Sequence, residues 1–81
     1  MTEAELGARF IEALMRGADE AAGTTTTLVS VNMEIVAPLA HGALRVEVNR
    51  KTRTLAFMRA DLIDGDGALI ATASSVHKSA A

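Results

Sequence analysis

The sequence predicts an α+β fold in which one long N-terminal helix packs on a four-stranded antiparallel sheet. Two observations lead to this prediction. Apolar residues recur every three or four positions over residues 2–22, and from residue 25 onward apolar and polar residues alternate. Short polar or glycine-containing segments divide the alternating part, and such short connections are typical of antiparallel strands.

The predicted helix spans residues 2–22. Thr2 and Glu5 have the spacing of a capping box, in which a hydroxyl and a carboxylate each accept a hydrogen bond from a free backbone N–H. Gly23 follows the last apolar residue and is a common helix stop. Charged residues occupy the opposite face, so we expect one side of the helix to lie on a core and the other in water. The apolar face consists of Leu6, Phe10, Leu14, Ala18 and Ala21.

Four strands are predicted at residues 25–36, 42–49, 53–64 and 68–78. Pro38 cannot donate to a sheet ladder and is expected to end the first strand, with a turn around Gly42 before the second. Because the connections are short, we expect an antiparallel meander in which each strand pairs with the next one in sequence. Alternation in the first strand predicts a shared face for Val29, Val31, Met33 and Ile35.

The size and composition of the chain predict self-association. Its 81 residues are enough for one domain, residues 1–81. Hydrophobic residues make up 49% of the chain, but many are alanine, and the aromatic residues are Phe10 and Phe57. A core with so few large side chains is marginal at this size. We therefore expect a homodimer or a higher homo-oligomer that buries apolar surface between copies.

Composition also disfavours several classes of protein. The net charge is −2 with both signs interspersed, whereas nucleic-acid binding domains are clearly basic. The absence of cysteine excludes a disulfide framework and a thiolate nucleophile, and it fits a reducing compartment. No apolar run approaches the roughly 18 residues of a membrane span, and no signal peptide pattern is present. We expect a cytoplasmic protein with neither a membrane nor a nucleic acid as its partner.

Four segments of the sequence carry a family resemblance. They are Val31–Pro38, Leu44–Val48, Arg50–Leu55 and the closing hairpin Asp64–Ala73, which reads DGDGALIATA. Together they resemble the hotdog fold of acyl-CoA thioesterases, in its phenylacetyl-CoA and 4-hydroxybenzoyl-CoA thioesterase-like branches. The resemblance covers about residues 5–78. Because that family has a further helix and strand before its long helix, the chain is expected to be a minimal or truncated member.

The resemblance implies a function as well as a fold. Such thioesterases hydrolyse an acyl- or aryl-CoA to the acid and free coenzyme A. The CoA moiety is part of the substrate, and neither a metal nor a redox cofactor is expected. The alternative is a non-catalytic hotdog module that binds an acyl ligand or serves only as an oligomeric scaffold, because a fold alone does not give a function.

Glu12 is the catalytic candidate that the resemblance implies. It falls near the helix position at which such thioesterases carry an Asp or Glu that activates water or attacks the thioester. The residues alone favour a different role. Glu12 lies on the polar helix face four residues before Arg16, which is the favourable order for an ion pair. A solvated or dimer-facing ion pair is therefore the alternative.

Two further sites follow from the resemblance. The family polarises the thioester carbonyl with backbone N–H groups at the start of the long helix, which points to the amides of Leu6 and Gly7. Basic residues near the second turn can hold the phosphates of coenzyme A, which points to Arg50, Lys51 and Arg53. For these three the alternative is a polar turn kept soluble by its charges.

The two histidines, His41 and His77, do not indicate a site. They are far apart in the sequence, so no Ser–His–Asp arrangement can be argued from them. Two histidines without cysteine do not form a metal-binding pattern, and no metal site is expected. We expect His41 in a surface turn and His77 at the fraying end of the last strand.

Overall fold

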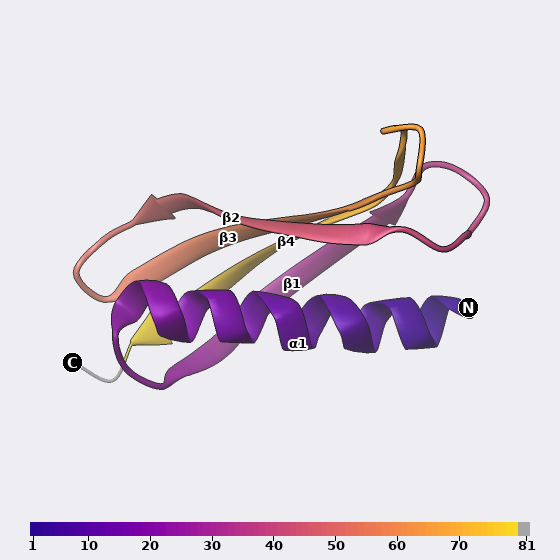
Figure 1. The fold of residues 1–81 in the computed structure, drawn as a ribbon. Helices are drawn as coiled ribbons and strands as arrows, with labels where there is room; N and C mark the ends of the chain where they lie inside the picture. Colours follow the sequence, from indigo (N-terminus) through magenta and orange to yellow (C-terminus); the bar gives the residue numbers. More distant parts are fainter. Residues whose placement is uncertain (80–81) are drawn as a thin grey trace.

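The computed structural model describes residues 1–79 and confirms an α+β fold of two layers, with one helix lying across one face of a four-stranded antiparallel sheet (Figure 1). The elements are α1 (Glu3–Ala22), β1 (Thr26–Ile35), β2 (Ala43–Lys51), β3 (Leu55–Ile63) and β4 (Leu69–Ser79). Each boundary lies within two residues of the one expected from the sequence. Residues 80–81 of the predicted domain lie outside the described part of the chain.

Both ends of α1 are determined by local sequence. The Thr2 hydroxyl accepts a hydrogen bond from the Glu5 amide at 3.1 Å, and the Glu5 carboxylate accepts one from the Thr2 amide at 3.3 Å. The predicted capping box is thus confirmed. At the other end Gly23 adopts a left-handed conformation with φ of 71°, and its amide donates to the Asp19 carbonyl at 2.9 Å. A side chain would strain this conformation, so glycine suits the position.

The order of the strands differs from the predicted meander. β2, β3 and β4 follow one another, but β1 pairs with β4, so the order is β1-β4-β3-β2 and the edges are β1 and β2. The prediction failed at residues 36–42, which do not form a hairpin turn but cross the end of the sheet (Figure 1). A connection of this length reaches about 23 Å when extended. The three interstrand spacings between the two edges add to about 14 Å, so the connection is long enough to cross.

This crossing connection closes one end of the core. The amides of Val36 and Ala37 both donate to the Ile70 carbonyl, at 2.9 and 3.1 Å, and hold the start of the connection against β4. Leu39 is half-buried and packs against the core. Pro38 suits a segment of this kind, because no ladder hydrogen bond is required from its nitrogen.

The core is thin and consists largely of small side chains. The apolar stripe of α1 is completely buried against sheet positions that are mostly alanine, so the helix backbone lies close to the strands. One close approach is at Gly17, where a Cβ would lie 2.9 Å from Val46 Cγ1 and 3.0 Å from Met58 Cε. The buried apolar residues are Leu6, Phe10, Leu14, Ala18, Ala56, Met58, Ala60, Leu62, Ile70, Ala71 and Ala73.

Two β-bulges change which side chains share a face. In β1 the pairing with β4 shifts between Leu28 and Ser30. The intervening Val29 is 59% exposed and does not share the core face as predicted. In β2 the pairing with β3 shifts between Val48 and Arg50. Because an extra residue reverses the alternation, residues beyond a bulge face the side opposite to the one that simple alternation predicts.

Replacing Gly42 by alanine is expected to destabilise the fold, because the new Cβ would overlap the backbone carbonyl of Ile63 on β3. We expect the free energy of unfolding to fall by about 1–3 kcal/mol, the usual cost of overpacking. Gly65→Ala is the matched control, since nothing lies within 4 Å of a Cβ at that turn position. Urea unfolding followed by circular dichroism measures both variants. Equal midpoints would show that the crossing connection does not press on β3.

Candidate functional site

A groove lies between α1 and the free edge of the sheet at β2, and we call it the α1–β2 groove. It contains two successive hollows. The smaller, of about 170 Å³, is lined by Arg9, Glu12, Ala13, Arg16 and Leu44. The larger, of about 440 Å³, is lined by Gly17, Glu20, Ala21, Val46, Glu47, Val48 and Met58. The larger hollow therefore has an apolar floor, and charged side chains line the edges of both hollows, which are open to solvent.

Local sequence on both sides explains the groove. The helix positions that line it next to β2 include three small residues, Ala13, Gly17 and Ala21. β2 is an edge strand, so Val48 is 46% exposed although it pairs with the buried Met58 and faces the helix side of the sheet. Small helix residues beside an unpaired edge leave a space that residues 1–79 do not fill.

Glu12 lies on the rim of the smaller hollow. Its Oε1 accepts a hydrogen bond from Nη2 of Arg16 at 2.8 Å, and the two side chains are 72% and 73% exposed, respectively. The ion pair expected from the sequence is therefore present. The same position leaves the carboxylate within reach of a ligand in the groove. In the groove the Glu12 carboxylate can accept a proton after its bond to Arg16 breaks. It can also do so through Oε2 while Oε1 stays bonded to Arg16.

The start of α1 does not provide the oxyanion site expected at Leu6 and Gly7. The Leu6 side chain is fully buried, and its amide donates to the Thr2 carbonyl at 3.0 Å as part of the helix. Gly7 lies one residue further in, beyond the four amides that a helix leaves without an internal partner. The physical reason is that the helix begins at Glu3, so its free amides precede both residues.

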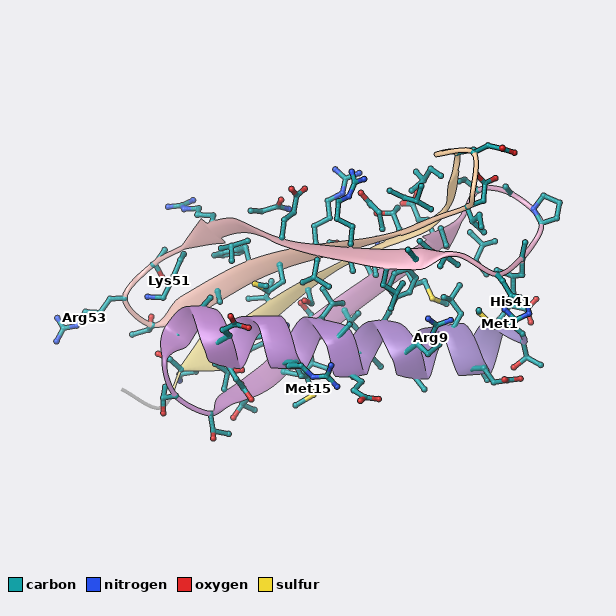
Figure 2. All side chains as sticks on the ribbon, viewed as in Figure 1. Met1, Arg9, Met15, His41, Lys51 and Arg53 are labelled. Carbon is teal, nitrogen blue, oxygen red and sulfur yellow. The ribbon has the colours of Figure 1, made fainter. Side chains whose placement is uncertain are left out.

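The three basic residues expected to hold coenzyme A are divided between the two faces of the sheet, because β2 continues to Lys51 and successive strand residues point to opposite faces. Lys51 and Arg53 lie at the β2–β3 turn, beside the end of α1 (Figure 2). Arg50 pairs with Phe57 and lies over its ring on the other face of the sheet, with Cζ 5.9 Å from the ring centre. Lys51 and Arg53 share a hollow of about 60 Å³ with Ala22, Thr24, Thr26, Thr52, Leu55, Ala56 and Ser79. The three basic residues therefore do not form one cluster.

Glu12 and the basic hollow lie at different points along α1. Glu12 is near the middle of the helix, whereas the hollow is next to Ala22, its last residue. The intervening helix rises about 15 Å, because each residue adds about 1.5 Å. The larger hollow of the groove lies along this stretch of the helix. A ligand that contacts both must be extended, with negative charge at one end.

A polar cluster that the sequence analysis missed lies at the last turn of α1, with three buried members and a half-buried carboxylate, Asp19. It consists of Asp19, Thr26, Ser75 and His77, and we call it the Asp19–His77 cluster. Oδ1 of Asp19 accepts hydrogen bonds from the Thr26 amide at 2.7 Å and the Thr26 hydroxyl at 2.6 Å. Nε2 of His77 lies 2.7 Å from Ser75 Oγ. Nδ1 of His77 has no hydrogen-bond partner within residues 1–79. His77 is completely buried, so the expected place at a fraying strand end is wrong.

Both titratable groups of the cluster have shifted pKa values. Hydrogen bonds from the Thr26 hydroxyl and amide, with a smaller contribution from the charge of His77, lower the pKa of Asp19. Burial lowers the pKa of His77, and the Asp19 carboxylate offsets this only in part. The sequence contained a signal for this burial, because Ser75 and His77 continue the alternating core positions of β4.

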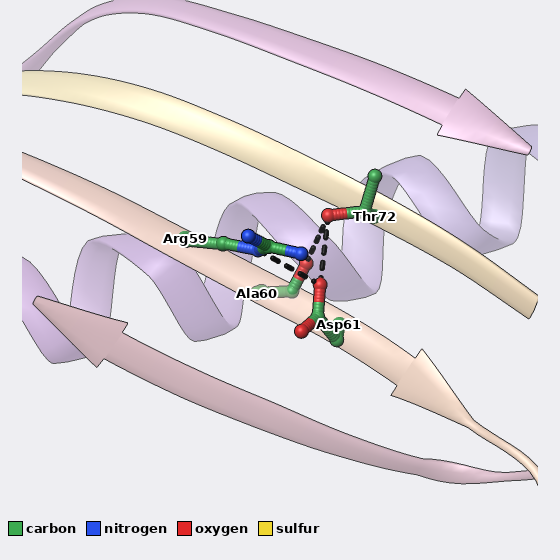
Figure 3. A network of polar contacts seen from close by, with 4 residues as sticks. All are labelled: Arg59, Ala60, Asp61 and Thr72. Carbon is green, nitrogen blue, oxygen red and sulfur yellow. Dashed lines mark hydrogen bonds and ion pairs between the residues drawn. The ribbon is translucent and has the colours of Figure 1, made fainter. Parts of the chain in front are cut away.

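The outer face of the sheet carries a polar network that is satisfied within the chain (Figure 3). Nε of Arg59 donates to Oδ1 of Asp61 at 3.1 Å, and the Thr72 hydroxyl donates to the same oxygen at 2.8 Å. The Asp61 side chain is only 16% exposed. The neighbouring hollow of about 280 Å³ is lined mainly by polar side chains. This hollow offers a ligand less apolar surface than the larger hollow of the α1–β2 groove does.

Within residues 1–79, His, Cys, Asp and Glu side chains do not gather in threes as metal ligands would. The helix of this part of the chain is not apolar enough to cross a membrane. Comparison with protein-family models, with curated proteins and with solved structures finds no match. A functional proposal must therefore rest on the geometry and chemistry of the chain itself.

Proposed function

We propose that the chain is a hotdog-type thioesterase that hydrolyses an acyl- or aryl-CoA to the acid and free coenzyme A. The observation that supports this most is the α1–β2 groove, in which a carboxylate, Glu12, lies beside an apolar floor. The arrangement of one long helix on an antiparallel sheet is also what the sequence resemblance implies. The absence of cysteine supports a cytoplasmic location, where thiols stay reduced.

In the proposed reaction Glu12 takes a proton from a water molecule as that water attacks the thioester carbonyl carbon. The C–S bond then breaks, and coenzyme A leaves as its thiol with the proton. Arg16 lies beside Glu12 and can stabilise the negative charge that develops on the carbonyl oxygen. The pantetheine arm lies along the larger hollow, and Lys51 and Arg53 bind the phosphates at its far end. The acyl or aryl group extends from the thioester to the other side, over Leu44 in the smaller hollow. A carboxylate and water suffice, so the proposal includes neither a metal nor a redox cofactor.

We further propose that a second copy of the chain covers the groove. β1 and β2 are the two edges of the sheet, and β2 carries the exposed Val48 beside the larger hollow. A sheet edge with exposed apolar side chains favours pairing with another strand. A copy paired along β2 would form the missing wall of the groove and shield the thioester from water.

The Glu12 proposal is tested by release of free thiol from a panel of short, long and aromatic acyl-CoAs. We expect Glu12→Gln to lower kcat/KM by about 10²-fold or more, the usual contribution of a general base. Glu34→Gln is the matched control, since it removes an exposed carboxylate from the outer face of the sheet. Full turnover by Glu12→Gln would discard Glu12 as the base. No turnover by the folded wild-type protein on any substrate would reject the enzyme.

The two-ended substrate model is tested at the basic hollow. Lys51→Ala and Arg53→Ala are each expected to raise KM for an acyl-CoA by up to about fivefold, as an exposed ion pair of about 1 kcal/mol allows. Arg50→Ala is the matched control, because Arg50 lies on the other face of the sheet. A truncated thioester that lacks the nucleotide should show no such effect. A rise in KM for Arg50→Ala alone would place the phosphates on the opposite face.

The interface proposal is tested by sedimentation equilibrium. Val48→Lys is expected to shift the chain from dimer to monomer, because it buries a charge at the proposed β2 interface. Val29→Lys, on the other edge, is the control and should leave the dimer intact. A dimer that persists in Val48→Lys and dissociates in Val29→Lys would place the interface at β1. A monomeric wild-type protein would reject self-association.

A non-catalytic hotdog module is the second candidate, favoured by the exposure of Glu12 and its pairing with Arg16. Such a module would bind an acyl-CoA in the groove without hydrolysing it. Calorimetric binding of a non-hydrolysable acyl-CoA analogue, with no turnover of the thioesters, would establish this function. Absence of both binding and turnover would leave an oligomeric scaffold.

A further inference from the structure

The Asp19–His77 cluster connects three parts of the chain. Asp19 belongs to the last turn of α1, and Thr26, which is 4% exposed, is the first residue of β1. His77 lies near the end of β4, between Leu28 of β1 and Ala56 of β3 in the register of the sheet. The helix, the two neighbouring strands and the turn at Gly23 therefore meet at this cluster.

We propose that the Asp19–His77 cluster is an acid-sensitive latch, in which uptake of one proton by His77 releases the last turn of α1 and the start of β1 from the sheet. The argument rests on the unpaired nitrogen of His77, on its complete burial and on the bonds that Asp19 already makes. The latch does not depend on the thioesterase proposal, because it is tested by hydrogen exchange and stability and not by enzyme activity.

A charged His77 cannot satisfy its hydrogen bonds in the folded protein. An imidazolium has two N–H donors, and one of them can donate to Ser75 Oγ, which lies 2.7 Å from Nε2. The other, on Nδ1, has no partner within residues 1–79. His77 is 0% exposed, so water does not reach that nitrogen in the closed structure. A buried charged donor without a partner is costly, and the cost is removed when the site opens to water.

Protonation of His77 also affects the contact between α1 and β1, which the hydrogen bonds between Asp19 and Thr26 form. Asp19 on α1 attracts the imidazolium, but the same Asp19 oxygen accepts both hydrogen bonds from Thr26. No hydrogen bond joins Asp19 to His77 in the closed structure of residues 1–79, and Oδ1 of Asp19 is already held by Thr26. Only Oδ2 could be offered to the imidazolium, and turning it toward His77 would strain the two bonds that Oδ1 makes. Without that movement His77 keeps an unpaired charged donor between α1 and β1.

Within residues 1–79, Asp19 is the carboxylate that acts on His77. The register partners of His77, Leu28 on β1 and Ala56 on β3, are uncharged. Lys51 on β2 and Arg53 in the following turn line the small hollow beside Thr26 and Ala56, which His77 does not line. Asp19 is therefore the charged group of this part of the chain that acts on His77.

The direction of the pH effect follows from the lowered pKa of His77. In the unfolded chain the histidine binds a proton near its ordinary pKa of about 6.5. In the folded chain it binds the proton at a lower pH. Between these two values the unfolded or opened state holds more protons, so closing becomes less favourable as the pH falls through this window. Above pH 6.5 the neutral histidine carries no such penalty.

Nuclear magnetic resonance on the wild-type protein tests the latch directly. The imidazole of His77 is titrated through its ring resonances while amide hydrogen exchange is followed on the same samples. We expect the amides of Thr26 and Gly23, which both donate to Asp19, to lose protection at the pH at which His77 titrates. The Leu6 amide, at the other end of α1, should keep its protection. Retained protection at Thr26, or simultaneous loss at Leu6, would overturn the latch.

A pair of variants tests the same proposal by stability. In the wild type the equilibrium constant for unfolding should rise as the pH falls below about 6.5, by up to about tenfold per pH unit, the limit for one proton. His77→Gln, whose amide cannot be protonated, should remove this rise. His41→Gln replaces the exposed histidine and should retain it. An unchanged slope in His77→Gln would overturn the proposal. If that variant does not fold, the titration of the wild type decides.

Discussion

The structure depends on the close approach between α1 and the sheet. A chain with two aromatic residues cannot fill a deep core, so the helix backbone must lie near the strands. Gly17 and the buried alanines of β3 and β4 make this possible, because they present little side chain between the two layers. The contact at Gly17 is already so close that a methyl group would displace Val46 or Met58. The side of α1 next to the edge strand β2 also carries small residues, Ala13, Gly17 and Ala21. Within residues 1–79 no further strand packs against them, so the α1–β2 groove remains open there.

Sequence patterns predicted the elements of this fold well, because each element is determined by nearby residues. The capping box needs only Thr2 and Glu5, and the end of the helix needs only Gly23. Strand pairing is a different problem, since it depends on which distant strands meet. The segment 36–42 is compatible with a turn when read alone. It crosses the sheet because β4 occupies the place beside β1 that a meander would give to β2.

The candidate site was predictable in part, and the limits have physical causes. The ion pair of Glu12 and Arg16 follows from helical spacing, and the structure contains it. The separation of Arg50 from Lys51 was not predicted, because the second strand was expected to end at residue 49 and both residues to lie in a turn. β2 instead continues to Lys51, which places the two on opposite faces, and the bulge after Val48 determines which face each takes. The alternation of β4 predicts that His77 is buried, whereas its polar side chain and its place late in the last strand predict exposure. Alternation is the better guide in such cases, since burial follows the face of the strand.

His77 is the residue whose presence the packing alone does not explain. It is among the largest fully buried side chains of a core that otherwise has few large ones. A leucine at this position would bury apolar surface without leaving a nitrogen unpaired, so the histidine costs stability for the volume that it fills. Polar groups elsewhere in the sheet avoid this cost, since Arg59, Asp61 and Thr72 bond one another on the outer face. The unpaired nitrogen lies where helix, turn and strands join, which is the place in this fold where one proton can change the contact between the layers.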